Sequence, residues 1–104
     1  MLIFMDMNHL KQINDIYGHG AGDELLIGAA QSIQKAYGSL GYCFRIGGDE
    51  FCAILPEIKI SEEELSRRLD AAVEEYNRSN DQKLSVARGI QLVTGQSGDE
   101  KEYQ

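Results

Sequence analysis

The chain has 104 residues, 42% of them hydrophobic, which is enough for one small domain with a modest core. Its formal net charge of −7 argues against a nucleic-acid-binding surface and against contact with an anionic membrane, because both need a basic patch. If the chain binds phosphates, we therefore expect a cation to mediate the contact.

An apolar run opens the chain, from Met1 to Met5, and stops at Asp6. The run is too short for a transmembrane helix and lacks the basic flank and the cleavage site of a signal peptide. It predicts a strand that is buried on both faces and carries a carboxylate at its carboxyl end. Open α/β sheets bind ligands at such strand ends.

Two helices are expected next, one on each side of a glycine-rich break. The first runs from about Asn8 to Tyr17, and the second runs from near Asp23 to a stop signal at Gly38. Residues 18–22, with the sequence GHGAG, separate them. The apolar spacing predicts as buried Leu10, Ile13 and Ile16 or Tyr17 in the first helix, and Leu25, Leu26, Ala29, Ala30, Ile33 and Tyr37 in the second.

A β-hairpin with acid at its tip follows the second helix. Two apolar runs, residues 42–46 and 51–55, flank a tip that contains Gly47, Gly48 and the carboxylates Asp49 and Glu50. A second glycine at such a tip suggests that a ligand comes close to the backbone. Close approach beside carboxylates favours a metal-bound phosphate.

The two cysteines, Cys43 and Cys52, lie one in each run of the hairpin and lack the spacing of a zinc site. A turn centred on residues 48–49 predicts the cross-strand pairs Cys43–Ile54 and Cys52–Arg45, a register that opposes a disulfide. We expect both to be reduced core residues of a cytosolic protein.

A third amphipathic helix is expected after Ser61, which forms a capping box with Glu64. The helix should end in the segment 77–80. Its apolar spacing predicts the buried side chains Leu65, Leu69, Ala72, Val73 and Tyr76.

The last predicted strand spans residues 84–93 and is interrupted at Gly89. Residues 1–94 are expected to form the folded core, and residues 95–104 a polar, frayed tail. The resulting element order predicts an α+β domain of the ferredoxin-like, palm type, in which helices pack on a sheet that contains antiparallel strands.

Three carboxylates can converge in such a sheet, because the first strand and the hairpin can be neighbours. Asp6 would then lie near Asp49 and Glu50, and the three would repel one another unless cations joined them. Magnesium prefers oxygen ligands and commonly combines carboxylates with substrate phosphates. Two such ions can activate an attacking hydroxyl and stabilise the leaving oxygen at phosphorus. The alternative is that each residue is an ordinary solvated acid.

Three motifs, in their order and spacing, resemble the GGDEF domains of bacterial diguanylate cyclases. They are residues 6–15 (DMNHLKQIND), the pairs Gly18-His19 and Gly22-Asp23, and residues 45–51 (RIGGDEF). The resemblance extends from Met1 to about Val93 and implies a nucleotide cyclase-like fold. It also implies that two GTP molecules are condensed into cyclic di-GMP, with release of pyrophosphate, by a homodimer in which each subunit holds one GTP.

This resemblance implies roles for the carboxylates. Asp6 and Asp49, together with the backbone carbonyl of Met7, would ligate Mg²⁺, or Mn²⁺ in its place, and Glu50 would assist. Asp49 would also accept the proton of the 3′-hydroxyl. The sequence does not separate the roles of Asp49 and Glu50.

The resemblance also implies contacts to the nucleotide. Lys11 would contact a phosphate, the alternative being a surface pair with Asp15 at i, i+4. Gly47 and Gly48 would leave room for the ribose and the α-phosphate, or else serve only a turn that needs positive φ.

Asn14 and Asp23 would contact guanine. A carboxylate can accept from the adjacent N1–H and N2–H donors of that base, whereas adenine offers an acceptor there. Asp23 could equally cap a helix. His19 aligns with a nucleotide-site histidine, the alternative being a structural role in a glycine-rich turn.

Departures from the family pattern set further expectations. The Arg-x-x-Asp motif of product inhibition is replaced by residues 38–41, with the sequence GSLG. Helices that flank the domain in relatives, one with phosphate-binding Lys and Arg, have no counterpart here, so the chain reads as a truncated catalytic core. We expect a fused upstream sensor domain, a cytoplasmic location and no direct contact with membrane or nucleic acid.

Two other functions compete with condensation of GTP. One is a regulatory module that binds GTP or dimerises without turnover. The other is nucleotidyl transfer as in a polymerase palm or a nucleotide cyclase, although the acidic surface disfavours a template-dependent polymerase.

Overall fold

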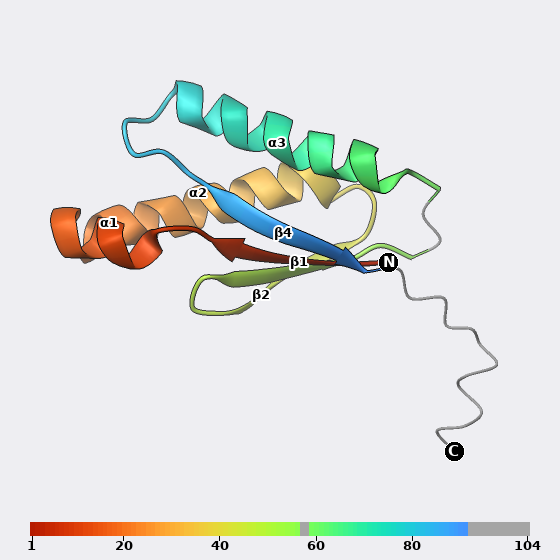
Figure 1. Ribbon diagram of the computed structural model, residues 1–104, viewed down its shortest axis with the longest axis horizontal. Helices are drawn as coiled ribbons and strands as arrows, with labels where there is room; N and C mark the ends of the chain where they lie inside the picture. Colours follow the sequence, from red (N-terminus) through yellow and green to blue (C-terminus); the bar gives the residue numbers. More distant parts are fainter. Residues whose placement is uncertain (57–58, 92–104) are drawn as a thin grey trace, which may run out of the picture.

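The computed structural model describes residues 1–56 and 59–91. An antiparallel sheet carries the two long helices on one face, and a short helix lies beyond one end of the sheet (Figure 1). The strand order is β2-β3-β1-β4, and every neighbouring pair is antiparallel. The elements in chain order are β1 (Leu2–Met7), α1 (Leu10–Tyr17), α2 (His19–Tyr37), β2 (Tyr42–Gly47), β3 (Glu50–Ile54), α3 (Glu62–Arg78) and β4 (Val86–Gln91).

The predicted element order and the α+β fold class are confirmed. The tail proposed for residues 95–104 lies outside the described residues. In the part of the chain that the structure describes, no helix combines the length and the apolar character needed to cross a membrane.

Helices cover one face of the sheet in the described structure. In β1 the side chains alternate: Ile3, Met5 and Met7 are buried beneath the helices, whereas Phe4 is 44% exposed and Asp6 is exposed on the opposite face. The prediction that this strand is buried on both faces is therefore wrong. The strand also continues through the predicted stop. Other apolar side chains exposed on the uncovered face are Tyr42, Phe44 and Ile54.

The break between the first two helices is shorter than predicted. Gly18, with φ of +94°, separates α1 from α2, and α2 begins at His19. Positive φ favours glycine, so this residue alone can turn the chain. The prediction that all of residues 18–22 interrupt the helix, with a new start near Asp23, is wrong. Gly20 lies in the first turn of α2, and Gly22 packs against the Asn14 side chain of α1.

Several expected core positions of these helices are exposed. On α1, Leu10 and Ile13 are half-buried and pack against the core, whereas Ile16 is 70% and Tyr17 is 58% exposed. The short α1 contacts mainly α2, so its far side has nothing to cover it in the described structure. Ala30 on α2 is also exposed, while the other predicted positions are buried or half-buried, namely Leu25, Leu26, Ala29, Ile33 and Tyr37.

The hairpin turns where the sequence predicts, but the register of its strands differs by one residue. Gly47 pairs with Glu50 around the residues 48–49. A β-bulge between Arg45 and Gly47 then leaves Ile46 without a cross-strand partner. The predicted register is wrong. The glycine and acidic residues predict where the hairpin turns, but they do not predict a bulge within its strands.

The shifted register keeps the two cysteines apart. Cys43 pairs with Ala53 and faces the helices, whereas Cys52 pairs with Phe44 on the other face. Both thiols are free, as predicted. Burial raises the pKa of both thiols, which keeps them protonated and poorly reactive at neutral pH.

The third helix begins as its capping signal predicts. The Glu64 N–H donates to Ser61 Oγ at 3.1 Å, while the Glu64 carboxylate pairs with Arg67 and Arg68. The predicted core positions Leu65, Leu69 and Ala72 are buried, and Val73 and Tyr76 pack against the core.

The last strand, β4, is continuous through Gly89, which pairs with Phe4 of β1. The predicted interruption at this glycine is wrong, because the pairing with β1 holds the residue in the ladder. Residues 92 and 93 of the predicted strand lie outside the described residues.

Tyr37 joins α2 to α3 inside the core. Its side chain has no exposed surface, and its hydroxyl donates to the Leu65 carbonyl at 2.7 Å. Burial is the main cause that raises the pKa of Tyr37 from its ordinary value of 10.0 to about 12. The unfolded chain releases this proton near pH 10, so the stabilisation is complete below pH 10 and is lost as the pH rises through 12.

We expect Tyr37→Phe to lower the free energy of unfolding by about 1 kcal/mol at pH 7, because the Leu65 carbonyl loses its donor. The variant should also lose stability less steeply than the wild type above pH 10. Urea unfolding of both proteins between pH 7 and pH 11.5 measures the two effects. Parallel pH profiles for the two proteins would contradict the assignment of this proton to Tyr37.

Candidate metal centre

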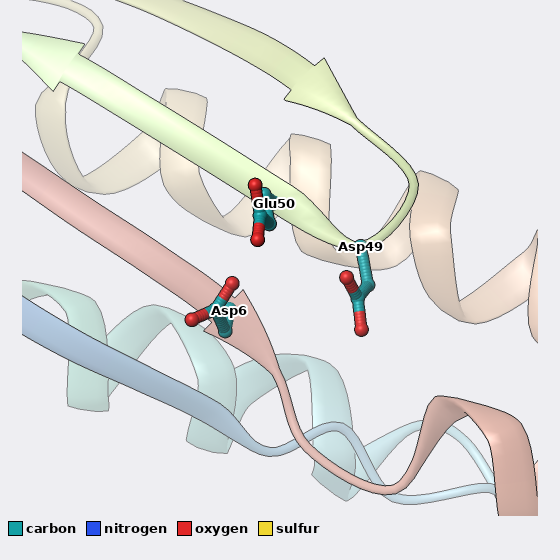
Figure 2. Close-up of side chains that lie close together, drawn as sticks. All are labelled: Asp6, Asp49 and Glu50. Carbon is teal, nitrogen blue, oxygen red and sulfur yellow. The ribbon is translucent and has the colours of Figure 1, made fainter.

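Three carboxylates meet at the hairpin end of the sheet. Asp6 lies near the end of β1, Glu50 opposite it at the start of β3, and Asp49 in the turn. One oxygen from each carboxylate lies within 4.8 Å of the others. Figure 2 shows the three side chains next to one another. Asp49 and Glu50 are neighbours in the sequence, and Asp6 lies 43 positions before Asp49. The fold brings the three together.

Strand pairing and one hydrogen bond create this geometry. Asp6 and Glu50 are cross-strand partners, so the pleat directs both to the uncovered face of the sheet. One residue further on, the Met7 N–H donates to the Asp49 carbonyl at 3.0 Å and holds the turn against the end of β1. The Met7 side chain is buried in the core, so only the backbone of this residue is available to the carboxylates.

The three charges have no cationic partner in the protein that the structure describes: within residues 1–56 and 59–91, no Lys or Arg forms an ion pair with them. Carboxylates this close repel one another, and a bound cation would relieve the repulsion. Asp6 and Glu50 are exposed and Asp49 is half-buried, so an ion can reach all three. Carboxylate oxygens suit hard divalent cations such as Mg²⁺ and Mn²⁺, and the donor set therefore fits such an ion.

The hairpin tip leaves space beside the carboxylates. A Cβ added to Gly47 or Gly48 would meet nothing within 4 Å. Gly48 has φ of +48°, which a glycine adopts readily, and the Arg45 Nε–H donates to its carbonyl at 3.0 Å. The turn explains Gly48, whereas Gly47 has no positive φ and lies beside the β-bulge with open space around it.

The link from β1 to α1 contains a backbone conformation that is unfavourable for its residue. His9, at the N-cap of α1, has φ of +64°, and its side chain makes no capping hydrogen bond. A residue with a Cβ in this region costs roughly 1–2 kcal/mol. The strained residue lies two positions after Met7, in the segment that leaves the carboxylate cluster.

We expect His9→Gly to raise the free energy of unfolding by about 0.5–1 kcal/mol, because relief of the left-handed conformation outweighs the entropy of the added glycine. His9→Val should lower it, since a β-branched residue tolerates positive φ least. Urea unfolding of the three proteins checks the order. A stabilised valine variant would contradict the described backbone.

Lys11 is not among the residues gathered at the carboxylates. Its side chain is 86% exposed, and its ammonium lies 3.6 Å from Asp15 in an i, i+4 pair on α1. Such exposed pairs contribute little to stability. The pairing matches the alternative role that the sequence left open for this lysine.

Asn14 lies on α1, and its side chain packs against Gly22 of α2. It is half-buried, and its Oδ1 is buried without a hydrogen-bond partner in the described structure. A Cβ on Gly22 would lie 1.8 Å from this oxygen, so the absence of a side chain at Gly22 makes room for the carboxamide. An unpaired buried acceptor is costly, so a donor that reached Asn14 Oδ1 would stabilise it.

The two remaining candidates lie on α2. His19 is the first residue of this helix, and Asp23 is exposed one turn later, beside the glycine that contacts Asn14. Asp23 does not cap the helix, because α2 begins four residues earlier.

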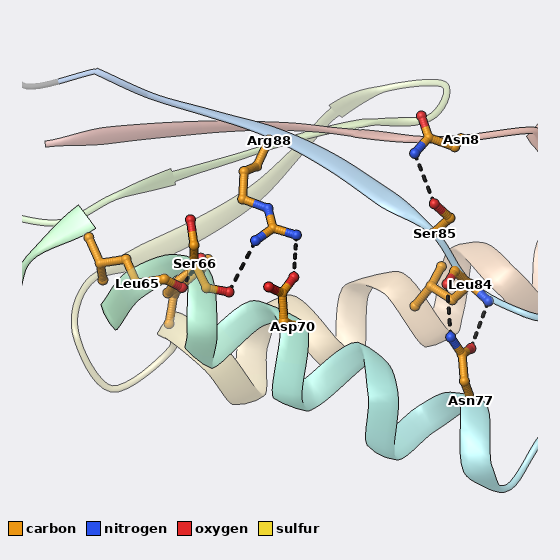
Figure 3. Close-up of polar contacts among 9 residues, drawn as sticks. Asn8, Leu65, Ser66, Asp70, Asn77, Leu84, Ser85 and Arg88 are labelled. Atoms are coloured by element: carbon orange, nitrogen blue, oxygen red, sulfur yellow. Dashed lines mark hydrogen bonds and ion pairs between the residues drawn. The ribbon is translucent and has the colours of Figure 1, made fainter. Parts of the chain in front are cut away.

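Sequence reasoning missed Ser85, which lies immediately before β4. The Asn8 N–H donates to the Ser85 carbonyl at 2.8 Å, and Asn8 Nδ2 donates to Ser85 Oγ at 2.9 Å (Figure 3). The two residues are 77 positions apart. Only the antiparallel pairing of β1 with β4 brings them together, and no local pattern signals it.

Comparison with known proteins assigns this constellation to a family. Residues 1–103 match the family described as "Diguanylate cyclase, GGDEF domain". The chain belongs to the GGDEF domain family. The three carboxylates are therefore the Asp and Glu of its eponymous motif together with Asp6 on the neighbouring strand.

Curated relatives agree with this assignment. The diguanylate cyclase DosC of Escherichia coli K12 is 31% identical over 99 residues, which cover 90% of this chain and 22% of DosC. The probable diguanylate cyclase DgcJ of the same strain is 49% identical over 55 residues, which cover 53% of this chain and 11% of DgcJ. The GGDEF chain thus spans about a fifth or less of these relatives.

Solved GGDEF structures share the fold. The GGDEF domain of DgcB from Caulobacter crescentus, in complex with c-di-GMP, is 25% identical with a TM-score of 0.71, over 98% of this chain and 64% of that one. A variant of PA1120 from Pseudomonas aeruginosa that comprises only the GGDEF domain is 26% identical with a TM-score of 0.72, over 85% and 54%.

Proposed function

We propose that this GGDEF domain is a diguanylate cyclase half-site. In each of two bond-forming events, the 3′-oxygen of one GTP bonds to the α-phosphorus of the other. The bond from that phosphorus to the bridging oxygen breaks, and pyrophosphate leaves. The observation that carries the proposal is the convergence of Asp6, Asp49 and Glu50 beside the open hairpin tip.

The carboxylates have separate tasks in this proposal. Asp6, Asp49 and the Met7 carbonyl would hold Mg²⁺, or Mn²⁺, with Glu50 assisting. When bound, the ion would offset the charge of the triphosphate and lower the pKa of the attacking hydroxyl. Asp49 would accept the proton of that hydroxyl.

Recognition of guanine would fall to α1 and α2. The Asn14 carboxamide and the Asp23 carboxylate would face the N1–H, N2–H and O6 groups of the base. The unpaired Oδ1 of Asn14 supports this role, because a guanine donor would satisfy it. His19, Gly47 and Gly48 would line the remaining nucleotide site, and Lys11 would turn from Asp15 to a phosphate.

Condensation requires two such sites facing each other, so the active unit would be a homodimer. Each subunit would present one GTP. A fused sensor domain would control how the two meet, which is consistent with relatives that are several times longer than this chain.

The proposal is tested by incubating the complete encoded protein with GTP and Mg²⁺. We expect cyclic di-GMP and pyrophosphate as products, identified by mass, and no product from ATP. A cyclic mononucleotide as the only product would instead identify a nucleotide cyclase.

One observation favours a second candidate, a GGDEF module that binds GTP without turnover. Lys11, the proposed phosphate contact, pairs with Asp15. If that pair persists with GTP bound, Lys11 would not reach the developing charge on the phosphate. Calorimetry that detects Mg²⁺-dependent GTP binding in a protein that forms no pyrophosphate would support this candidate.

A further inference from the structure

Hydrogen bonds connect α3 to the segment before β4, and that segment to the end of β1 (Figure 3). They begin at Asn77 near the end of α3, whose Nδ2 donates to the Leu84 carbonyl at 3.0 Å and whose Oδ1 accepts from the Leu84 N–H at 2.7 Å. These two bonds fix the backbone of the loop immediately before β4. Ser85 is the next residue.

Ser85 continues the connection to β1. The β1–β4 ladder ends at the pair Met7–Val86, and one step beyond it Asn8 bonds to Ser85 through both backbone and side chain. Asn8 is half-buried and Ser85 is exposed. The side-chain bond thus closes the open end of the ladder, where a strand would otherwise fray.

Met7 stands between this closure and the cluster. Its backbone pairs with Val86 on one side, and its N–H donates to the Asp49 carbonyl on the other. If the end of β1 moved away from β4, the distance from Asp6 to Asp49 would change with it. Metal sites tolerate little such movement, and groups that orient the ligands matter nearly as much as the ligands.

We propose that Ser85 is a positioning residue for the metal site, acting through Asn8 to hold Asp6 and the Met7 backbone at a fixed distance from Asp49. This inference rests on the proposed function only in its assumption that these residues bind a divalent cation. The Ser85 hydroxyl contacts neither metal nor substrate. Its effect is on the separation of the ligands.

A purely structural role would have a different signature. One exposed hydrogen bond contributes roughly 1 kcal/mol or less to folding, so its loss would leave the protein folded. Loss of a group that orients metal ligands typically lowers metal affinity by about 10–100-fold. Metal affinity at unchanged folding therefore separates the two roles.

The test titrates the complete encoded protein with Mn²⁺ alone, without nucleotide, and follows the free ion by electron paramagnetic resonance. The Mn²⁺-binding event that is lost in Asp6→Asn is assigned to the carboxylate site, and only its affinity is compared. We expect Ser85→Ala to weaken this binding about 10-fold and Ser85→Thr, which keeps the hydroxyl, to restore it to within about 2-fold.

Two further variants make the test specific. Ser39→Ala, at an exposed serine between α2 and β2, should bind Mn²⁺ as the wild type does. Asn8→Ala should weaken binding as Ser85→Ala does, and the double variant should lose no more than either alone, because both remove one bond.

Three outcomes would overturn the inference. Equal Mn²⁺ affinity in Ser85→Ala and Ser39→Ala would refute it while leaving the proposed function intact. An affinity loss that merely follows the unfolded fraction, measured by urea unfolding, would show a structural role. A wild-type protein with no Mn²⁺ step sensitive to Asp6→Asn would refute both this inference and the proposed metal centre.

Discussion

Asp49→Asn is expected to reduce formation of cyclic di-GMP at least about 100-fold, the lower range for loss of a general base. The amide is nearly isosteric with the carboxylate, so the turn and its bond from Met7 to the Asp49 carbonyl should remain. What is lost is one negative charge among three that lie within 4.8 Å. The rate of pyrophosphate release from GTP, with the complete encoded protein, measures the effect.

Asp81→Asn is the matched control, because it makes the same substitution at an exposed carboxylate in the loop after α3. It removes the same charge from the protein and should leave the rate within about 2-fold, as exposed acids away from a site are only solvated. Equal activity in the two variants would refute the role of Asp49. The half-saturating Mg²⁺ concentration should rise in Asp49→Asn alone.

The order of elements could be predicted because each long element has a clear local pattern. The capping residues Ser61 and Glu64 and the apolar spacing of α3 agree with the observed helix. The turn at residues 48–49 agrees as well. These signals are local, and tertiary contacts reinforce rather than replace them.

The errors arise where tertiary contacts decide. The pairing of Gly89 with Phe4 keeps a glycine within a strand, and the contact of Gly22 with Asn14 of α1 lies within a helix that the glycines were expected to interrupt. The bulge at Ile46 shifts a register that the turn alone would not shift. No local propensity encodes these effects.

The carboxylates of the site could be predicted because antiparallel neighbours in a small sheet are few. Asp6 ends an apolar run and Asp49 sits at a hairpin tip, so any topology that pairs these strands joins them. The closure by Asn8 and Ser85 could not be predicted, since Ser85 stands in no recognisable pattern and the two residues meet only through the β1–β4 pairing.

Gly22→Ala should lower the free energy of unfolding by about 1–3 kcal/mol, as expected when atoms are forced into a packed contact. The new Cβ would lie 1.8 Å from Asn14 Oδ1 and 2.6 Å from its Cγ, so the carboxamide has to leave its place between α1 and α2. If Asn14 contacts guanine, the KM for GTP should rise about 10-fold, the equivalent of one good hydrogen bond. Urea unfolding and steady-state kinetics measure the two effects.

Gly20→Ala provides the control, because it makes the same change two residues earlier in α2, where an added Cβ meets nothing within 4 Å. There alanine should stabilise the helix by up to about 1 kcal/mol. The opposite signs of the two substitutions isolate the clash with Asn14 from helix propensity.

An Asn14→Ala background tests directly whether the Asn14 side chain causes the clash. With the carboxamide removed, Gly22→Ala no longer meets Asn14 and should become neutral or stabilising, so the two substitutions are strongly non-additive. A Gly22→Ala cost that persists in this background would show that contacts other than Asn14 exclude the side chain. Reversal of its sign would show that the Asn14 side chain causes the clash at Gly22, and the KM for GTP separately tests the proposed guanine contact.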